Sequence, residues 1–366
     1  MKILFVAPLN SVHSRRWIQY FADKGTNEVY VLNFEEQTVE LTNVNVMTIR
    51  LPGGFWKKCL FFVPIISRAR SFIRKTNPDF IHVHWVSFAH YFLFWGLSFP
   101  LVITPWGSDI LINTKKFFIS CFIRKFLPQG SLFICDARHL KDKLIELGAD
   151  QAKVQLIYFG TDVRKFHPDR KDRSIWKELG FEEGVSIVLS LRALKPIYDV
   201  RTFILSIPEI LREYGSARFV AVGRGEEKPK LVQLVQELGI TEKVRFLEGL
   251  SDEAMQKVVA SADVYVSTSL SDGGLAASTA EAMACEVPVV VTDFGENGKW
   301  VENGVSGFLF PLSDHRELAQ KVVDLLKDPA YAKDIARAGR RVIEERNNYY
   351  KEMEKTEALY EKIIQG

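Results

Sequence analysis

Short apolar runs rich in β-branched residues alternate along the chain with segments whose apolar residues recur at helical spacing. This alternation is typical of βαβ units, whose parallel strands are buried on both faces by the connecting helices. We expect strands at 2–7, 29–32, 44–49, 80–85, 100–104, 131–135 and 154–158, and a second set at 186–190, 217–223, 244–249, 263–267, 287–292 and 307–310. The two sets predict an α/β protein of two doubly wound, Rossmann-like domains.

The boundary between the two sets lies in a polar, turn-rich stretch at 159–173 that has no apolar period. Helical patterns fill the gaps between strands, for example at 14–24, where Gly25 has the place of a C-cap. Only helical patterns follow Pro329. We predict an N-terminal domain at 1–165, a second domain at 166–347 and a terminal helix at 348–366, since 366 residues suffice for two such cores.

One stretch, 80–108, has no charged residue, and its length is close to that of a membrane span. Histidines and prolines interrupt this stretch, and its local period changes. We therefore predict a buried strand, a helix at 87–98 and a second strand, and not a transmembrane helix.

The N-terminal run MKILFVAP lacks the longer apolar core and the cleavage site of a signal peptide. The four cysteines, at 59, 121, 135 and 285, have neither CxxC nor zinc-site spacing, which favours buried thiols in a reducing compartment. Both observations predict a cytoplasmic protein.

Loops that follow the carboxyl ends of the strands bind ligands in doubly wound sheets, and in two-domain forms the cleft lies between the domains. The first such loop, 8–17, has no glycine, which argues against a dinucleotide enzyme of the GxGxxG type, and the chain has no P-loop motif. Its polar side chains would either meet an anion or begin a helix, with Ser11 or Ser14 as the N-cap. These candidates are Asn10, Ser11, His13 and Arg16.

The loop after the first strand of the second domain, 191–196, carries Arg192 and Lys195, with no acidic residue before Asp199. Two cations at this place suit a diphosphate, since arginine makes bidentate contacts and lysine is a compact charge. A solvated surface pair is the alternative, and such a pair contributes little energy.

The segment 269–298 passes from a strand through Asp272, Gly273 and Gly274 to a helix that begins near Ser278. Free amides in the glycine loop and at the helix start suit phosphate groups. Glu281, one turn into the helix, would accept hydrogen bonds from ribose hydroxyls. Alternatively, Ser278 and Glu281 form a capping box.

His82 and His84 lie on one face of a predicted strand, as metal ligands would, but no third ligand follows at a diagnostic spacing. We favour polar residues at a strand end over a metal site. The chain contains no Asp-x-Asp, the commonest metal-holding motif of sugar-nucleotide enzymes, and no GxSxG or HExxH signature.

Several segments of the second domain resemble the donor domain of retaining family 4 glycosyltransferases, which have the GT-B architecture of two facing Rossmann-like domains. These segments are RALK (192–195), VGRG (222–225), VRFLEG (244–249), EAMACEVPVVVTDFG (281–295) and VENGVSGFLF (301–310). In the first domain, HVHW (82–85), ITPWGSD (103–109) and IYFGTDVRKFHP (157–168) resemble family positions as well. By this resemblance, 348–366 is the helix that returns to the N-terminal domain.

The resemblance implies transfer of a sugar from a nucleoside diphosphate sugar to an acceptor with retention of configuration, and without a metal or other cofactor. Catalysis would rest on stabilising the departing diphosphate. Arg192 and Lys195 are the implied catalytic residues, and Glu281 is implied to hold the ribose. Further donor-side positions are Gly225, Asp272, Gly273, Gly274, Leu275, Ala276, Ala277 and Ser278. Positions on the acceptor or diphosphate side are Asn10, Ser11, His13, Arg16, His84, Trp106 and Asp109.

Three positions depart from the family pattern and indicate a subgroup. Gly273 has the place of the first of two family glutamates, with Asp272 beside it. Trp106 has the place of a histidine near the donor sugar, and the spacing of three between Arg192 and Lys195 is shorter than usual.

Charge divides the chain, although its net value is only +3. Residues 1–160 hold 19 basic and 11 acidic side chains, against 29 and 34 in 161–366. The excess of basic residues lies in 51–125, which contains ten basic and only two acidic residues, and the basic residues are interleaved with phenylalanines. Segments 61–75 and 115–126 have the pattern of cationic amphipathic helices, which favours an anionic membrane surface and a lipid-linked or cell-envelope glycan acceptor. The alternative is an ordinary aromatic core with solvated cations.

Other functions use the same fold. An epimerase or a phosphorylase of GT-B type would share the site, and a non-catalytic nucleotide-sugar binding protein would bind the donor without transfer. No nucleic-acid reader motif is present, and we expect no nucleic-acid partner. The sequence leaves the base, the sugar and the acceptor open.

Overall fold

The computed structural model describes residues 1–36, 40–52, 61–271 and 274–365. It divides into two compact units, residues 1–159 with 351–366 and residues 160–350. Among the predicted site residues, Asp272 and Gly273 lie outside the described part of the chain, as do Lys57 and Lys58 of the basic segment.

The first unit is built on a parallel sheet that has seven strands within the described residues, in the order β3-β2-β1-β4-β5-β6-β7. Leu4 of β1 is paired with Tyr30 of β2 on one side and Ile81 of β4 on the other. The strands are β1 (Lys2–Val6), β2 (Glu28–Asn33), β3 (Val44–Thr48), β4 (Phe80–His84), β5 (Leu101–Thr104), β6 (Leu132–Cys135) and β7 (Val154–Leu156).

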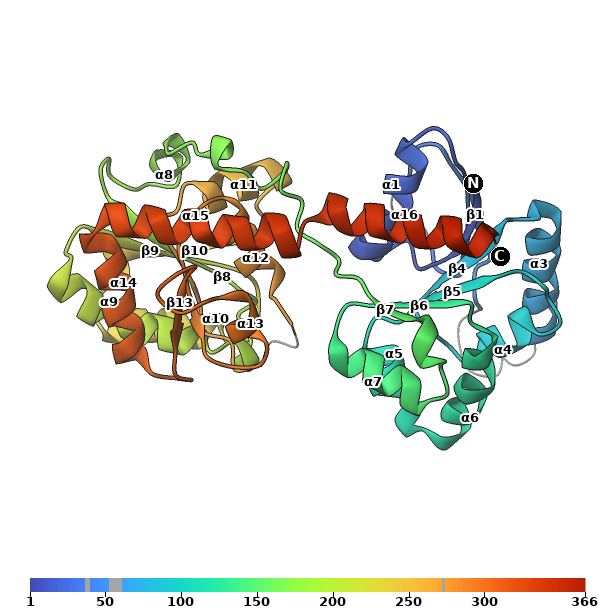
Figure 1. Cartoon of the computed structure of the whole chain (residues 1–366). Helices are drawn as coiled ribbons and strands as arrows, with labels where there is room; N and C mark the ends of the chain where they lie inside the picture. The colour runs from blue at the N-terminus through green and yellow to red at the C-terminus, as the bar shows by residue number, and fades with distance from the viewer. Residues whose placement is uncertain (37–39, 53–60, 272–273, 366) are drawn as a thin grey trace. The chain divides into compact units, whose positions relative to one another are not determined.

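Helices cover both faces of this sheet (Figure 1). One face carries a large apolar core shared with α3, α4, α5, α6 and α7, and the other packs against α1 and α16. The helices are α1 (Val12–Asp23), α3 (Phe62–Thr76), α4 (Ala89–Phe94), α5 (Ser108–Leu111), α6 (Phe117–Phe126), α7 (Arg138–Glu146) and α16 (Tyr349–Gln365). Short 3-10 turns are η1 (Asn113–Lys115), η2 (Leu127–Gln129) and η3 (Gln151–Lys153).

The last helix, α16, is joined to the first sheet by a buried chain of polar contacts. Trp17 Nε1 donates to the Tyr360 hydroxyl at 3.1 Å, and this hydroxyl lies 2.5 Å from His82 Nδ1. His82 Nε2 lies 2.7 Å from Thr104 Oγ1. Burial holds the pKa of His82 well below its ordinary value and that of Tyr360 well above, so both are neutral. We assign the Tyr360 hydroxyl as the donor to His82 Nδ1 and place the ring proton of His82 on Nε2. Each of these polar groups then has a partner.

The second unit has a parallel sheet of six strands over its described residues, in the order β10-β9-β8-β11-β12-β13. Its strands are nearly continuous runs of buried apolar residues because helices cover both faces. The strands are β8 (Ser186–Leu191), β9 (Ala217–Val222), β10 (Val244–Leu247), β11 (Val264–Ser267), β12 (Val289–Thr292) and β13 (Phe308–Phe310).

Two apolar cores lie on the two faces of this second sheet. One holds residues of α9, α10 and α14, and the other holds residues of α8, α11, α12 and α15. The helices are α8 (Ser174–Glu178), α9 (Val200–Glu213), α10 (Lys228–Glu237), α11 (Asp252–Ala260), α12 (Ala277–Ala284), α13 (Asn297–Trp300), α14 (His315–Lys327) and α15 (Pro329–Arg346). The 3-10 turns are η4 (Pro168–Arg170), η5 (Pro196–Tyr198) and η6 (Thr241–Lys243).

The structure confirms the predicted fold class and every predicted strand, and it corrects two helices. The helix expected at 87–98 is much shorter, because α4 spans only Ala89–Phe94 and the chain leaves it through Gly96, which has φ +68°. The helix expected at 14–24 begins earlier, at Val12, because Ser11 is its N-cap. Among the described residues, no helix is long and apolar enough to cross a membrane.

The chain enters the second unit at Gly160 and leaves it at Tyr350, and these two ends of the unit lie side by side. Thr161 N donates to Asn347 O at 2.7 Å, and Tyr349 N donates to Thr161 O at 3.0 Å. Gly160 has φ +69°, and a Cβ there would lie 2.4 Å from Tyr349 Cα. Only glycine allows this close approach of two backbones.

We predict that Gly160→Ala lowers the free energy of unfolding by about 3 kcal/mol or more, since a left-handed alanine costs about 1–2 kcal/mol and the backbone clash adds to it. Urea unfolding measures the change. Gly180→Ala is the matched control, because Gly180 has φ +84° but nothing within 4 Å of an added Cβ. Equal losses for the two variants would contradict the role of the close approach.

Candidate functional site

The loop after β8 presents the two predicted cations of the second unit at the carboxyl end of its central strand. Arg192 is half-buried, and its guanidinium lies 4.4 Å from the centre of the Tyr198 ring. Lys195 is exposed and directly precedes the turn η5. The stacked ring restricts the direction of Arg192, while the Lys195 ammonium is free to follow an anion.

The glycines of 222–225 fix this loop by close contact with its backbone. A Cβ at Gly223 would lie 2.1 Å from Arg192 O, and one at Gly225 would lie 2.0 Å from Leu194 O. Leu194 N donates to Arg224 O at 2.9 Å, and Glu227 N donates to Leu194 O at 3.0 Å. Gly225, predicted on the donor side, therefore supports the loop that carries the cations.

The loop after β11 is bonded to the same turn. Thr268 Oγ1 donates to Tyr198 O at 2.9 Å, and Leu270 N donates to Ile197 O at 2.9 Å. The structure thus brings 192–198, 223–227 and 268–271 together at one edge of the second sheet. These three loops come from β8, β9 and β11, which are neighbours in the sheet.

Helix α12 follows this loop and begins at Ala277, with Ala276 as an N-cap that makes no side-chain hydrogen bond. The capping box of Ser278 and Glu281 is therefore wrong: the Ser278 hydroxyl lies 2.7 Å from the buried Tyr265 hydroxyl instead. Gly274, Leu275 and Ala276 lead into the helix and are half-buried.

The first turn of α12 offers backbone amides that have no partner within the helix, which is the usual anion-binding feature of a helix start. Glu281 lies in the second turn and is half-buried. The second unit therefore combines two cations, a helix N-terminus and a carboxylate, which suits a ligand with both phosphate and hydroxyl groups.

In the first unit, the loop after β1 begins α1 as the polar-start alternative predicts. Ser11 Oγ accepts from Ser14 N at 3.4 Å. Asn10 is exposed, and its Nδ2 donates to Glu36 O at 3.3 Å. Arg16 is half-buried on the same helix.

Three aromatic rings meet at the carboxyl edge of the first sheet. Trp106 and Phe159 stack with centres 4.8 Å apart, and His13 lies 4.8 Å from Phe159 and 5.3 Å from Trp106. Partial desolvation of the ring, and to a smaller extent Arg16, lowers the pKa of His13, so its neutral form dominates at pH 7. Sequence reasoning identified His13 and Trp106 but missed Phe159, because an apolar residue after a strand has no signature of its own.

His84 lies at the end of β4 and is fully buried. Its Nδ1 lies 3.1 Å from Ser14 Oγ, and its Nε2 has no hydrogen-bond partner within the described chain. Both nitrogens of His82 are engaged by Tyr360 and Thr104, so His82 is not available to a metal. Among the described residues, no three His, Cys, Asp or Glu side chains form a metal-binding group.

Asp109 is buried, and its carboxylate accepts from Val86 N at 2.7 Å, Trp106 N at 3.0 Å and Ile110 N at 3.1 Å. Burial nevertheless raises its pKa to about 6. Three backbone bonds leave this side chain little capacity for a ligand, so Asp109 orients the loop of Trp106.

Two family models match the chain, one within each of its two units. A family model described as "Glycosyl transferase 4-like" matches residues 2–135, and one described as "Glycosyl transferases group 1" matches residues 171–342. N-acetyl-alpha-D-glucosaminyl L-malate synthase of Bacillus anthracis is 24% identical over 306 residues, which cover 82% of this chain and 79% of that protein.

Solved structures share the fold over the whole chain. A glycosyltransferase of Rickettsia africae superposes with a TM-score of 0.80 at 17% identity, covering 100% of this chain and 99% of that one. Alr3699/HepE of Anabaena, solved in complex with UDP, gives 0.78 at 19% identity, covering 99% of this chain and 100% of that one.

Buried histidines of the first unit predict acid sensitivity. Burial lowers the pKa of His84 to about 3 and that of His90 to about 4, from 6.5. Below pH 6.5 the unfolded chain binds these protons and the folded chain does not, so stability is complete above pH 6.5 and falls toward pH 4. The raised pKa of Asp109 has the opposite effect on the pH dependence of stability, but it is one group against two histidines.

We predict that His90→Gln flattens the fall of unfolding free energy between pH 6 and 4.5 by about 1.4 kcal/mol per pH unit, the value of one proton. Urea unfolding at a series of pH values measures the slope. His139→Gln, at an exposed position, is the control and should keep the parent slope. A parent slope in His90→Gln would show that His90 does not titrate as its burial requires.

Proposed function

Because the chain belongs to the family 4 glycosyltransferases of the GT-B fold, we propose that it transfers a sugar from a nucleoside diphosphate sugar with retention of configuration. The observation that carries the proposal is the group of cations, helix N-terminus and carboxylate at one edge of the second sheet. UDP is bound by the structural relative from Anabaena, and a nucleoside diphosphate is the ligand class that this group would hold.

The proposed chemistry needs stabilisation of negative charge on the leaving diphosphate. Arg192, held against Tyr198, would bind the diphosphate oxygens, and Lys195 would neutralise the charge that develops as the sugar–phosphate bond breaks. The amides of the first turn of α12 would add fixed dipoles. The acceptor hydroxyl would lose its proton to the leaving phosphate oxygen, so the protein supplies no nucleophile and, in this proposal, no metal.

Glu281 would accept hydrogen bonds from the ribose hydroxyls of the donor. A carboxylate is repelled by a diphosphate, but a carboxylate is well suited to accept hydrogen bonds from the neutral hydroxyl groups of the ribose. We further propose that the carboxyl edge of the first sheet, with His13, His84 and Trp106, receives the acceptor.

The acceptor would be lipid-linked or lie at a membrane surface, since α6 and the residue that follows α4 carry large exposed apolar side chains, and unpaired cations lie in and before α6. Trp95, Phe117 and Phe118 are 64%, 85% and 63% exposed. Among the described residues, Lys115, Lys116 and Lys125 make no ion pair, and each is exposed. Aromatic rings surrounded by cations are typical of a surface that rests on anionic lipids.

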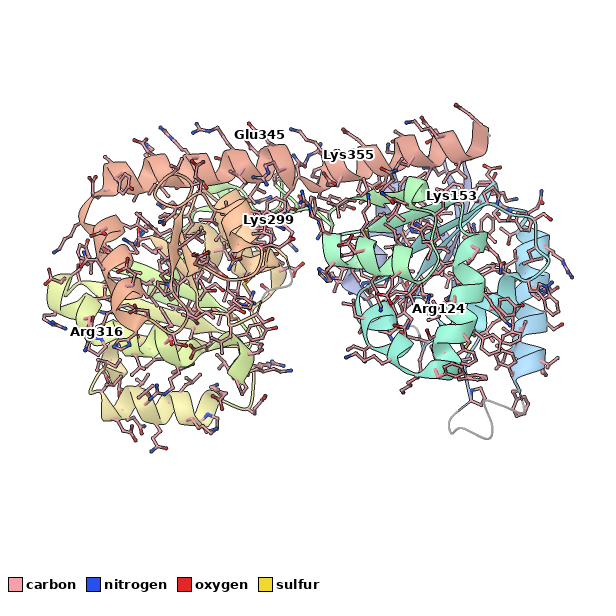
Figure 2. The ribbon with its side chains drawn as sticks, turned by 60° about the horizontal axis from the view of Figure 1, so that its bottom comes forward. Arg124, Lys153, Lys299, Arg316, Glu345 and Lys355 are labelled. Carbon is pink, nitrogen blue, oxygen red and sulfur yellow. The ribbon has the colours of Figure 1, made fainter. Side chains whose placement is uncertain are left out.

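Two other basic residues of this region have structural roles. Arg70 donates to the carbonyls of Phe92 and Trp95, at 3.1 and 2.7 Å, at the end of α4. Arg124, labelled in Figure 2, donates to Glu146 O at 2.8 Å. The proposed membrane surface therefore depends on α6 and its preceding turn more than on the total charge.

The rival activities differ in what they consume. An epimerase would interconvert nucleotide sugars without an acceptor, a phosphorylase would need inorganic phosphate, and a non-catalytic binding protein would retain the donor unchanged. Slow donor hydrolysis, which yields nucleoside diphosphate and free sugar, separates transfer chemistry from a binding protein. The epimerase would be recognised by a second nucleotide sugar among the products, and the phosphorylase by its dependence on inorganic phosphate.

We predict that Lys195→Ala lowers the rate of nucleoside diphosphate release by about 10²-fold or more, the usual effect of removing one transition-state stabiliser. The measurement uses a panel of UDP-, GDP-, ADP- and CDP-sugars, with EDTA present to test independence from metal. The circular dichroism spectrum should not change, since Lys195 is exposed.

Lys230→Ala is the matched control, because Lys230 is an exposed lysine of the same unit that pairs with Glu227. It should retain the parent rate. Near-parent turnover of Lys195→Ala with a verified donor would remove Lys195 from the mechanism, and the absence of hydrolysis with every donor would favour the binding protein.

We predict that the protein sediments with anionic liposomes, less so as salt is raised, and that replacing Phe117 and Phe118 by serine lowers the bound fraction severalfold. Both side chains are exposed, so folding should be retained. Lys333→Ala, an exposed site of the second unit, is the control. Equal binding of all three proteins, or none by the parent, would reject the membrane surface.

A further inference from the structure

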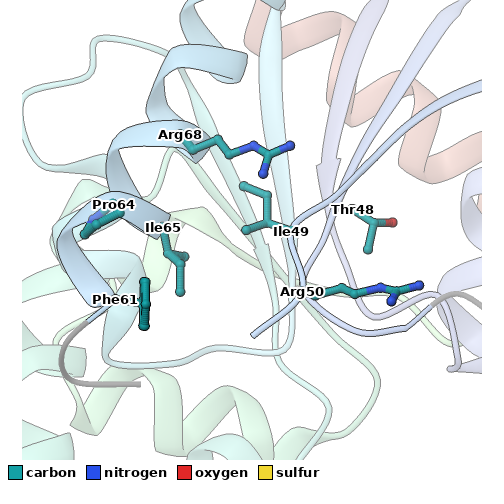
Figure 3. A pocket seen from close by; sticks show the side chains of 7 residues that line it. All are labelled: Thr48, Ile49, Arg50, Phe61, Pro64, Ile65 and Arg68. Atoms are coloured by element: carbon teal, nitrogen blue, oxygen red, sulfur yellow. The ribbon is translucent and has the colours of Figure 1, made fainter. Parts of the chain in front are cut away.

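A cavity of about 620 Å³ lies in the first unit, between α3 and the residues that follow the edge strand β3. Its volume is in the range of ligand pockets. Figure 3 shows Phe61, Pro64 and Ile65 on the helix side and Ile49 and Arg50 on the other, with the guanidinium of Arg68 extending from α3 toward Ile49.

The residues on the helix side of this cavity lie along one face of α3. Phe61, Pro64, Ile65 and Arg68 recur at spacings of three and four, which places them on the same side of α3. Three apolar side chains therefore lead to a cation. Among the residues that the structure describes, no acidic side chain lines the cavity.

The guanidinium group of Arg68 is available to an anion. Arg68 is exposed and makes no ion pair with any described residue. Arg50 pairs with Glu36 at 3.2 Å, and its side chain extends away from the helix side of the cavity (Figure 3).

The cavity also lies beside the loop that sequence analysis placed on the acceptor side. Asn10 donates to Glu36 O, and Glu36 pairs with Arg50, so the loops after β1, β2 and β3 are linked in a row at the carboxyl edge of the sheet. A molecule in this cavity would extend from the same edge as His13 and Trp106.

We propose that this cavity binds the phosphate ester of a hydrocarbon chain, with the phosphate at Arg68 and the chain against Phe61, Pro64 and Ile65. A guanidinium group recognises phosphate by bidentate contacts, and the apolar wall removes hydrocarbon from water. That this ligand represents the acceptor rests on the proposed glycosyl transfer. That the cavity binds such a ligand does not depend on the proposed function.

Isothermal titration of the full chain with decyl phosphate, below its micelle concentration, tests the site. The parent should bind it saturably, and Arg68→Gln should weaken binding about tenfold or more, the usual effect of losing a charge-assisted hydrogen bond. Arg74→Gln is the control, since Arg74 is an exposed arginine of α3 that does not line the cavity, and it should change the affinity by less than about twofold.

Inorganic phosphate and decanol separate the two parts of the ligand, and each should bind at least about tenfold more weakly than decyl phosphate, because each loses one half of the contacts. Equal weakening by Arg68→Gln and Arg74→Gln would reduce the effect to general charge attraction and overturn the site. Equal affinity for inorganic phosphate would overturn the hydrocarbon contact.

Donor hydrolysis measured on the same preparations distinguishes this inference from the proposed function. Hydrolysis without decyl phosphate binding overturns the cavity site and leaves glycosyl transfer standing. Specific binding of decyl phosphate without hydrolysis of any donor supports the site and overturns glycosyl transfer. Arg68→Gln should hydrolyse the donor at the parent rate, because Arg68 belongs to the first unit and the proposed donor residues belong to the second.

Discussion

Parallel strand pairing is the constraint on which the chemistry of this protein depends. Every described strand pair in both sheets is parallel, so the carboxyl ends of each sheet meet at one edge. Loops that are far apart in the sequence, such as those holding Lys195 and Thr268, therefore become neighbours. A parallel sheet in turn requires helices on both faces, which is why most of each unit's apolar residues serve only to support this edge.

Close backbone contact turns the edge of the second sheet into a defined site. Gly223 and Gly225 let one loop approach the carbonyls of Arg192 and Leu194, and hydrogen bonds join 268–271 to the turn at 196–198. A side chain on either glycine would displace the loop that holds both cations. Rigid placement matters because catalysis by charge stabilisation requires the charges to be in position before the bond breaks.

The first unit combines a rigid interior with a surface of unusual composition. The buried contacts among Trp17, His82 and Tyr360 join α16 to the sheet, and the bonds of Asp109 orient the loop of Trp106. Outside this interior lie the exposed aromatic residues of α6 and the arginine-lined cavity beside α3. Both surface features suit amphiphilic ligands that carry negative charge.

The sequence by itself determined the alternation of strands and helices, since hydrophobic period is a local property of the chain. It also identified Arg192, Lys195 and Glu281 as candidates, because their residue types and their places after strands are readable without contacts. Sequence patterns gave the wrong length for α4 and left a capping box open for Ser278. Only tertiary contacts decide whether the Ser278 hydroxyl bonds to its own helix or to Tyr265.

Only the tertiary structure decided which residues meet. The stacking of Phe159 on Trp106, the partnership of His82 with Tyr360 across 278 positions and the pairing of Glu36 with Arg50 leave no local signal. Asp109 was a candidate for ligand contact through the family resemblance of 103–109, and its three backbone bonds give it a supporting role. Local period fixes what each segment becomes, whereas long-range packing fixes what each side chain does.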